Sequence, residues 1–490
     1  MKKILIYIIA TFAGSQLLAQ SRMTLHQLNA TVPHANQINP SFLPPYKLVI
    51  GLPVISSTRI YAENDQLSFN DIFTRQEGDD SLTVDEDKII SNLRDNNDLD
   101  IGGDVALLYV GLNIRNNYFS LALNERAMSN FDYTKDLVTW ALKGPADEAF
   151  DNRGLDIKDL DIGALAFHEI ALGWGRQLNE RFNVGVRLKY LVGYLNVNTE
   201  SLTGVISANI DTLSIFADQI TINSSGVRNF DSNVSEDFSD AFLSFSNSGF
   251  GIDLGAQFRP NDRLTFSASV TDIGSISWND FQRSYQLNSV TYAFNGFDLL
   301  DLIADTPNKD FLQNELDSIK DLFDPQEVDG ISYSTTLPWN FYGGVEFEFV
   351  ERQKIGALFY TTHKAGRLRP ALSLSYNLRL RKVLNAVVNA SIIDGEFTNL
   401  GLGFSADLGP VQVFATTNNI FSLAFPARAS ILSANFGLNL VFGKSQKEEF
   451  DEVTPSGEPA RPKYSRKKVV KTKEKRIKQQ YKKKKRKRYN

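Results

Sequence analysis

The segment Leu400-Gly401-Leu402-Gly403-Phe404-Ser405-Ala406-Asp407-Leu408 alternates apolar side chains with small or charged ones. This two-residue period is that of a β-strand with one apolar face. Seven segments of this kind follow one another between residues 341 and 443, separated by very short or Gly/Asn/Asp-rich turns. Such a series predicts a closed antiparallel barrel, whose apolar face contacts either a protein core or lipid.

The same period predicts an all-β protein with fourteen strands. They lie near 47–60, 104–114, 117–126, 161–177, 181–198, 249–260, 262–274, 341–351, 353–363, 367–380, 383–393, 398–408, 410–419 and 431–443. A further candidate hairpin, 202–210 with 213–222, would raise the number to sixteen and keep it even. After the first 20 residues no run of 18 apolar residues exists, which argues against a helical membrane protein.

The predicted connections separate by length. Tight turns fall at 115–116, 178–180, 260–262, 351–353, 380–382 and 408–410, and long segments fall at 61–103, 127–160, 199–248 and 275–340. Counted along the strands, every tight turn lies on one side of the barrel and every long segment on the other. This sorting is typical of outer-membrane barrels and, with an even number of strands, predicts that both termini are periplasmic. Helical spacing of apolar residues predicts helices at 133–142 and 297–323 in two of the loops.

The first 19 residues predict export. Lys2 and Lys3 precede the apolar stretch 4–12, and Leu-Leu-Ala at 17–19 is typical of a cleavage site, so we predict a signal peptide at 1–19. The chain has no Cys. This absence excludes disulfides, thiolate metal sites, Cys nucleophiles and a lipid-modified N-terminal cysteine.

The mature chain divides into four predicted parts: a plug-like segment at 20–46, the barrel at 47–443, a linker at 444–463 and a disordered tail at 464–490. The plug segment contains several prolines and does not alternate. The net charge of −5 hides a segregation, since residues 466–490 hold 15 Lys and Arg against one acidic residue and the remaining chain holds 37 basic and 56 acidic residues. Such a block of like charges cannot bury a core, which predicts disorder.

The tail is the candidate anchor of the chain in the periplasm. Its densest basic run is Lys482, Lys483, Lys484, Lys485, Arg486, Lys487 and Arg488. Three roles stay open: an electrostatic anchor to the cell wall or to anionic lipid, a docking segment for an acidic periplasmic partner, and a solvated tail without specific contacts. Export argues against nucleic acid as a partner.

Catalytic chemistry has few candidates in this sequence. The chain has four His and lacks HExxH, CxxC, G-x-S-x-G and P-loop motifs, so we predict no enzyme, no cofactor and no metal site. The polar residues assigned to the lumen by the strand period are Glu346, Glu348, Asp253, Arg259 and Arg369. Paired carboxylates serve general acid–base catalysis in some enzymes, but an ion-paired barrel interior is the simpler interpretation.

Two further features have alternative interpretations. Acidic stretches at 77–80, 85–87 and 95–104 lie in predicted loops and offer oxygen ligands for calcium, although their spacing is not that of an EF-hand. Solvated acidic loops are the default interpretation. His168 lies in the middle of a predicted strand, and we interpret it as a lumen or core histidine with a hydrogen-bond partner.

The segment QINPSFLPPY at 37–46, followed by KLVIGLPVISS at 47–57, resembles the start of an uncharacterised family of Bacteroidota outer-membrane barrels. Those barrels look like relatives of the FadL-type long-chain fatty acid transporters and of PorV, a barrel of the type IX secretion system. The segments ATTNN at 415–419 and NFGLNLVFG at 435–443 are similar to the same group. In FadL-type proteins an Asn-Pro-Ala motif lies in an N-terminal hatch, so the resemblance implies a plug motif at Asn39, Pro40 and Ser41.

Two functions of different classes follow. The first is FadL-like uptake of hydrophobic small molecules, which predicts an apolar pocket between the loop helices and the lumen. The second is a non-transporting scaffold for a secretion or envelope-assembly machine, which predicts a sealed lumen with the tail and loops as contacts. Outer-membrane lipid is an expected partner in both.

Overall fold

The computed structural model describes residues 22–64, 67–75, 82–144, 147–150, 153–208, 213–226, 242, 244–294, 326–329, 331–364, 366–380, 383–393, 396–425 and 431–444. The predicted signal peptide, the helix at 297–323, nearly all of the linker and the basic tail lie outside these residues and stay predictions. Among the described residues no helix is long and apolar enough to cross a membrane.

The elements follow the chain in this order: α2 (Met23–His26), η1 (Pro33–Gln37), β1 (Tyr46–Gly51), β2 (Thr58–Asn64), α3 (Phe69–Ile72), β3 (Phe73–Arg75), β4 (Leu82–Val84), α4 (Glu86–Asn92), β5 (Asn96–Ile114), β6 (Asn117–Thr134), α5 (Lys135–Lys143), η2 (Glu148–Phe150), β7 (Leu155–Asp156), β8 (Asp161–Gln177), β9 (Phe182–Ala208), β10 (Leu213–Ser225), β11 (Ser248–Phe258), β12 (Leu264–Trp278), β13 (Gln282–Phe294), β14 (Gln326–Asp329), β15 (Tyr333–Thr336), β16 (Trp339–Val350), β17 (Gln353–Lys364), β18 (Arg367–Leu380), β19 (Leu384–Ile393), β20 (Glu396–Leu408), β21 (Val411–Thr417), α9 (Ile420–Ala424) and β22 (Ile431–Lys444).

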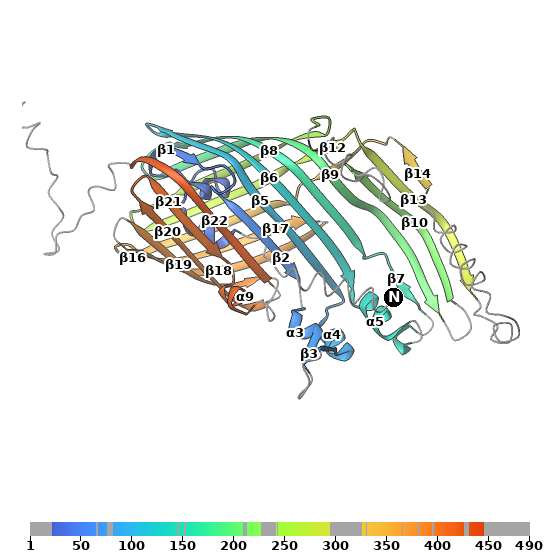
Figure 1. Ribbon diagram of the computed structural model, residues 1–490. Helices are drawn as coiled ribbons and strands as arrows, with labels where there is room; N and C mark the ends of the chain where they lie inside the picture. The colour runs from blue at the N-terminus through green and yellow to red at the C-terminus, as the bar shows by residue number, and fades with distance from the viewer. Residues whose placement is uncertain are drawn as a thin grey trace, which may run out of the picture. The chain divides into compact units, whose positions relative to one another are not determined.

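Fourteen antiparallel strand positions close into a barrel (Figure 1). The order around the wall is β1 with β2, β5, β6, β8, β9, β11, β12, β15 with β16, β17, β18, β19, β20, β21 and β22, and β22 pairs with β2 to close the ring. Each position corresponds to one predicted strand. The candidate hairpin also forms, because β9 runs beyond the wall and pairs with β10, but it extends one wall strand and does not add two.

The two ends of the barrel differ in their connections. At one end, called the turn end, short links join β5 to β6, β8 to β9, β11 to β12 and β16 to β17, and the other end, called the loop end, carries α3, α4 and α5 (Figure 1). The predicted sorting was wrong in two places. β17 ends at Lys364 and β18 begins at Arg367, and β19 ends at Ile393 and β20 begins at Glu396, so two links as short as the turns lie at the loop end.

The first wall strand is broken, in contrast to the continuous strand predicted at 47–60. β1 and β2 both pair with β5, and residues 52–57 leave the sheet between them. Pro53 has no N–H for the ladder, and Val54 adopts a left-handed φ of 69°. The sequence around Pro53 therefore interrupts the strand without ending it.

The wall has an apolar outer face and a polar inner face. On β18, Leu372, Leu374 and Tyr376 are 46%, 62% and 39% exposed, and the intervening Ser373 and Ser375 are 0% and 8% exposed. Because successive side chains of a strand point to opposite faces, the apolar set lies outside and the polar set lines the lumen. The polar face is therefore the buried one, which reverses the arrangement of a soluble β-protein.

The loop end has its own small core. The predicted helix at 133–142 is confirmed as α5, which begins slightly later because β6 continues to Thr134; the hydroxyl of Thr134 accepts a hydrogen bond from the Leu137 N–H and caps the helix. The apolar residues buried between α3, α4, α5 and β6 are Leu67, Ile72, Ile89, Leu93, Tyr133, Val138 and Leu142. β10, β13 and β14 extend the sheet of β9 beyond the wall (Figure 1).

Candidate functional site in the plugged lumen

Residues 22–45 lie inside the barrel, toward the turn end, as a plug (Figure 1). Wall side chains donate hydrogen bonds to the plug backbone: Asn377 Nδ2 to Gln27 O at 2.6 Å, Gln412 Nε2 to Thr31 O at 2.5 Å, Ser269 Oγ to Ile38 O at 2.9 Å and Arg187 Nη2 to Gln37 O at 2.9 Å. A buried carbonyl without a partner costs about 1–3 kcal/mol. These donors therefore give the plug one specific seat.

The predicted plug motif is at the centre of this seat. Asn39 Oδ1 accepts hydrogen bonds from the backbone N–H and the hydroxyl of Ser41, at 2.9 and 2.6 Å, and Asn39 Nδ2 donates to the carbonyl of Ala268 on β12. A Cβ at Gly185 would lie 2.2 Å from the carbonyl carbon of Pro40. The wall strands thus approach the motif so closely that glycine is needed opposite it.

The plug also has an apolar set of side chains. Met23, Leu25, Leu28, Val32 and Ile38 are at most 1% exposed. They form one cluster with inward-facing residues of β16 to β22, which are Tyr342, Leu358, Tyr360, Ala371, Val387, Ile393, Phe414 and Ile431. The plug is therefore held by apolar packing together with polar contacts on the arc from β16 to β22, and by polar contacts with β9 and β12 elsewhere.

Two plug histidines are fully buried. His34 Nε2 lies 3.0 Å from Asn439 Oδ1, and its Nδ1 lies 3.2 Å from Gln37 Nε2, which assigns the proton to Nε2. His26 stacks on Tyr342 with ring centroids 5.9 Å apart, and neither of its ring nitrogens has a hydrogen-bond partner among the described residues. Burial lowers the pKa of each histidine from 6.5 to about 4, so both are neutral near pH 7.

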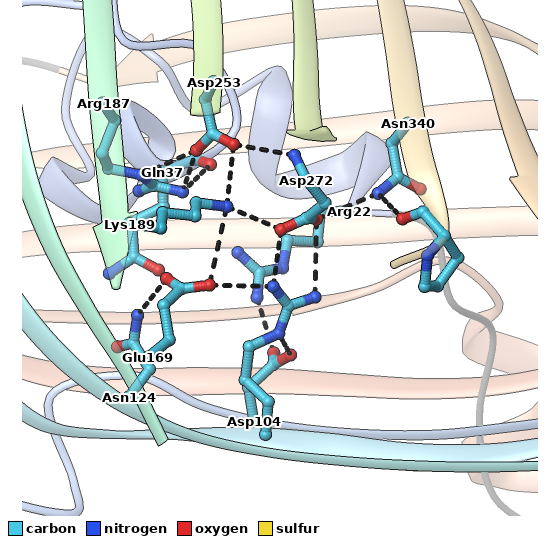
Figure 2. Close-up of polar contacts among 12 residues, drawn as sticks. Arg22, Gln37, Asp104, Asn124, Glu169, Arg187, Lys189, Asp253, Asp272 and Asn340 are labelled. Carbon is cyan, nitrogen blue, oxygen red and sulfur yellow. Dashed lines mark hydrogen bonds and ion pairs between the residues drawn. The ribbon is translucent and has the colours of Figure 1, made fainter. Parts of the chain in front are cut away.

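Beside the plug, seven consecutive wall positions supply a charge cluster. Its members, called the central cluster, are Arg22 of the plug, Arg59 of β2, Asp104 of β5, Arg126 of β6, Glu169 of β8, Arg187 and Lys189 of β9, Asp253 of β11 and Asp272 of β12. Figure 2 shows its polar contacts around Lys189, Asp253 and Asp272. Arg22 Nη2 lies 2.6 Å from Asp104 Oδ2 and links the start of the plug to the wall.

Each carboxylate of the central cluster pairs with cations of adjacent strands or, for Asp272, with cations of strands farther along the wall. Asp253 lies 2.6 Å from Arg187 Nη2 and 2.7 Å from Lys189 Nζ, and Asp272 lies 2.6 Å from both Lys189 Nζ and Arg126 Nη1. Glu169 accepts from Arg126 at 2.9 Å. The cluster contains five cations and four carboxylates, and all of them are largely buried. Because an unpaired buried charge is strongly destabilising, each of these groups needs a partner of opposite charge.

Asp272 reaches the cluster through a strand irregularity. Its φ is 65°, and its backbone N–H donates to Asp253 Oδ1 at 2.7 Å, where the register of β11 and β12 shifts. A cavity of about 40 Å³ remains between the cluster and the plug. Arg22, Arg126, Met128 and Tyr342 are among its lining residues. Its size matches one or two water molecules.

An apolar cluster faces the lumen on the loop-end side of these charges. Its members, called the lumen apolar cluster, are Leu165, Phe167, Leu191, Ile276, Trp278 and Leu337, with Met128 and Tyr333 packed against it. The guanidinium of Arg126 lies 5.3 Å from the ring centre of Phe167, so the apolar and the central clusters adjoin. Met128 belongs to the edge of both the apolar cluster and the cavity.

The five polar residues assigned to the lumen occupy three separate places. Asp253 belongs to the central cluster. Glu346 accepts from Asn29 of the plug at 2.5 Å and from Lys354 at 3.3 Å, and Glu348 accepts from the Arg352 N–H in a turn.

The other two predicted residues also lie apart. Arg259 donates to Gln257 at 2.7 Å near the turn end. Arg369 contacts Asp98 and Asp100 at the loop end. The structure therefore places Glu346 and Glu348 beside plug and turn atoms, and no acid–base pair forms between them.

Two sequence interpretations need correction. Residues 96–104 are not an acidic loop, because β5 already begins at Asn96, and Asp98 and Asp100 are ion-paired in the lumen. His168 has the expected hydrogen-bond partners, Glu125 and the carbonyl of Phe242. It lies on the outer face of β8, however, since Glu169 occupies the inner one.

Most members of the central cluster were not singled out from the sequence. A usable signal exists: Arg126, Glu169, Arg187, Lys189 and Asp253 all occupy inward positions of the two-residue period on adjacent strands. Arg22 and Asp272 give no such signal, because the first depends on the path of the plug and the second on the register shift.

A family model described as "Family of unknown function (DUF5723)" matches residues 40–418. The chain belongs to DUF5723. The match begins at Pro40 of the plug motif and covers the wall strands through β21. No curated protein matches this DUF5723 chain.

Several solved structures are distantly similar. A TodX deltaS2S3 mutant, a monoaromatic hydrocarbon channel, has 8% identity and a TM-score of 0.41, covering 88% of this chain and 97% of its own. The Ralstonia pickettii toluene transporter TbuX has 8% identity and a TM-score of 0.41, covering 84% and 95%. A Pseudomonas aeruginosa FadL homologue has 10% identity and a TM-score of 0.40, covering 84% and 94%. At these values the function of the DUF5723 chain has to be inferred from its own residues.

Proposed function

We propose that this DUF5723 barrel spans an outer membrane and takes up small hydrophobic molecules through its lumen. The membrane assignment is supported by the outer face of the wall. Leu172, Leu188, Phe250 and Leu374 are between 58% and 74% exposed and lie on four different strands. An apolar band of this kind around a closed barrel matches the hydrocarbon of a bilayer. In water the same band would be an unfavourably large exposed apolar surface.

The lumen apolar cluster is the observation that carries the uptake proposal. A barrel wall that only holds water has no need of large apolar side chains such as Phe167, Leu191 and Trp278 at inward positions. These side chains are fully buried against one another in this closed state. A hydrophobic molecule that enters from the loop end replaces their mutual contacts with its own at little cost in apolar area.

Binding to a matched pair of variants on β9 tests this proposal. Leu191→Asn places an amide in the lumen apolar cluster, and Leu188→Asn makes the same change on the outer face. With protein in nanodiscs and N-phenyl-1-naphthylamine as the ligand, we expect saturable fluorescence above that of empty nanodiscs. Leu191→Asn should weaken the affinity about tenfold, since one buried apolar side chain contributes roughly 1.5–3 kcal/mol. Leu188→Asn should change it little.

Two results would contradict uptake of hydrophobic molecules: no saturable signal from the unmodified protein, or equal affinities for the two variants. Migration of unheated and heated samples on SDS gels verifies that each variant is a folded barrel. The same samples serve both measurements, so that a folding defect is not mistaken for a binding defect.

A second candidate is a scaffold without transport. The observation that favours it is the narrow space beside the plug, since the described residues leave a cavity of about 40 Å³ at the central cluster. In this proposal both termini are periplasmic, and residues 464–490 contact the cell wall, anionic lipid or an acidic partner. Pull-downs of the full chain and of a chain truncated after Gly443 test it: a scaffold loses its envelope partners on truncation, whereas equal recovery contradicts the idea.

A further inference from the structure

A second group of charges spans the lumen at the loop end. Its members, called the mouth cluster, are Asp98 and Asp100 of β5, Asp132 of β6, Lys364 of β17 and Arg369 of β18. Lys364 Nζ contacts Asp100 and Arg369 Nη1 contacts Asp98, and Arg369 also lies 2.9 Å from Asp100 and 3.9 Å from Asp132. The side chains of Asp98 and Asp100 are 7% and 1% exposed, so these pairs are shielded from water.

The partners come from opposite walls of the barrel. β17 is the seventh position from β5 in either direction around the fourteen-position ring. A round barrel of fourteen strands, spaced about 4.8 Å and tilted about 40°, is about 28 Å across. Touching Lys and Asp side chains hold their Cα atoms within roughly 13 Å. The ion pairs therefore draw the two walls together across the lumen.

The mouth cluster is separate from the plug. On β6 the inward positions run from Arg126 of the central cluster through Met128 and Asn130 to Asp132 of the mouth cluster. The lumen apolar cluster lies between the two groups of charges, with Met128 at its edge. Along β6 the mouth cluster therefore lies nearer the loop end than the lumen apolar cluster and the plug do.

We propose that the mouth cluster is a gate of the uptake route, which opens when the β17–β18 hairpin moves away from β5 and β6 while the plug stays seated. This inference rests on the proposed function for the route that the gate controls. The link of β17 to β18, residues 365–366, is short, so the hairpin moves as one unit. Its two cations face three carboxylates, and separation of the walls exposes all five groups to water, where charges are best solvated.

Thiol labelling tests the gate without requiring transport. The chain has no native Cys, so Met128→Cys supplies a single reporter between the mouth cluster and the plug. A membrane-impermeant methanethiosulfonate is added from the loop-end side of protein in intact cells. The double variant Lys364→Gln with Arg369→Gln should raise the labelling rate of the Met128→Cys reporter about tenfold or more, because access follows the open fraction.

A matched control distinguishes loss of the ion pairs across the lumen from loss of positive charge on the hairpin. Arg367→Gln removes one cation from the same hairpin at an exposed position, and we expect the labelling rate to change less than about twofold. The charge reversal Asp98→Arg with Arg369→Asp keeps a pair across the lumen and should restore slow labelling. It also provides a second, independent variant if the double glutamine variant does not fold.

Salt provides a further readout. Added salt should accelerate labelling of the protein that retains Lys364 and Arg369, since ions weaken the ion pairs whenever the two walls separate transiently. Salt should have little effect on labelling of the double glutamine variant. The gate is overturned if Met128→Cys is labelled at the same rate with and without the mouth cluster. Failure of naphthylamine binding, by contrast, contradicts the uptake proposal and leaves this result unchanged.

Discussion

The central cluster and the mouth cluster are built from the same residue types, but they connect different parts of the barrel. The central cluster joins side chains of consecutive strands, from Arg59 of β2 to Asp272 of β12, and adds Arg22 of the plug. The mouth cluster joins β5 and β6 to β17 and β18 across the lumen. Most central pairs join strands at most two positions apart, and Arg126 with Asp272 spans four, whereas the mouth cluster pairs β5 with β17 across seven positions. Strands that are close in the wall cannot separate while the barrel is intact, whereas opposite walls can.

This difference assigns different roles to similar ion pairs. Breaking one partner of the central cluster leaves an unpaired charge where water has little access, which is strongly destabilising. Breaking the mouth cluster leaves charges that become solvated once the walls separate. We therefore expect central variants to change stability, and mouth variants to change access to the lumen.

The largest expected effect is that of Asp253→Ala. It leaves Arg187 and Lys189 without a shared carboxylate at a site where Asp253 is 0% exposed, and should lower the free energy of unfolding by about 3–5 kcal/mol. Urea unfolding of lipid-reconstituted protein measures the change. Asp156→Asn is the control, because Asp156 at the end of β7 pairs with Lys158 at an exposed position and should change the free energy of unfolding little. Equal effects of the two variants would remove the distinction.

A change at the plug seat should come next. Gly185→Ala puts a methyl group 2.2 Å from the carbonyl carbon of Pro40, and overpacking of this kind typically costs about 1–3 kcal/mol. Gly251→Ala is the matched control, since its methyl group would contact Lys189 at an ordinary 3.5 Å. Trypsin cleavage of the N-terminal segment reports plug release and should be faster in Gly185→Ala alone. Equal protection of both variants would show that the motif has no close seat.

Acid should loosen the plug through its histidines. The pKa of His26 is lowered to about 4 in the fold, against 6.5 when unfolded, so the unfolded state binds more protons between these values. The free energy of unfolding is therefore full above pH 6.5 and falls as the pH drops toward 4, by about 3 kcal/mol for each such histidine. His26→Phe keeps the ring contact with Tyr342, removes two unpartnered nitrogens, and should remove about half of this acid loss. Urea unfolding at pH 7 and pH 4.5 checks it; an unchanged pH dependence would contradict burial of a neutral ring.

The smallest expected change in stability belongs to the mouth cluster. Lys364→Gln with Arg369→Gln should lower the free energy of unfolding less than Asp253→Ala does, because the remaining carboxylates gain water as the walls part. The same double variant should label rapidly when it also carries the Met128→Cys reporter. A loss as large as that of Asp253→Ala would mean that the mouth cluster holds the fold together, as the central cluster does.

The sequence predicted the wall because a two-residue period is local. Leu402 and Phe404 alternate with Gly403 and Ser405 whatever the rest of the chain does. The ion clusters depend on which strands end up opposite or adjacent at a given height. Arg369 and Asp98 are 271 residues apart, and only the closed ring with its register brings them together.

Local irregularities account for the remaining differences. Asp272 enters the central cluster through a left-handed backbone conformation that no hydropathy pattern encodes. The break at Pro53 and the run of β5 through the acidic stretch 96–104 were likewise settled by pairing with neighbouring strands. The Asn39 motif was identified by resemblance to a family. The close contact between this motif and wall glycines such as Gly185 could be recognised only in the structure.

The orientation of the wall residues in a bilayer tests the central claim most directly. Nitroxide labels placed one at a time from 401 to 405 on β20 sample both faces of the segment that first indicated the fold. We predict high accessibility to oxygen at 402 and 404, which face outward, and low accessibility at 401, 403 and 405, which face the plugged lumen. Accessibility without a two-residue period, or greater exposure of 402 and 404 to a water-soluble nickel complex than to oxygen, would contradict a membrane-spanning barrel.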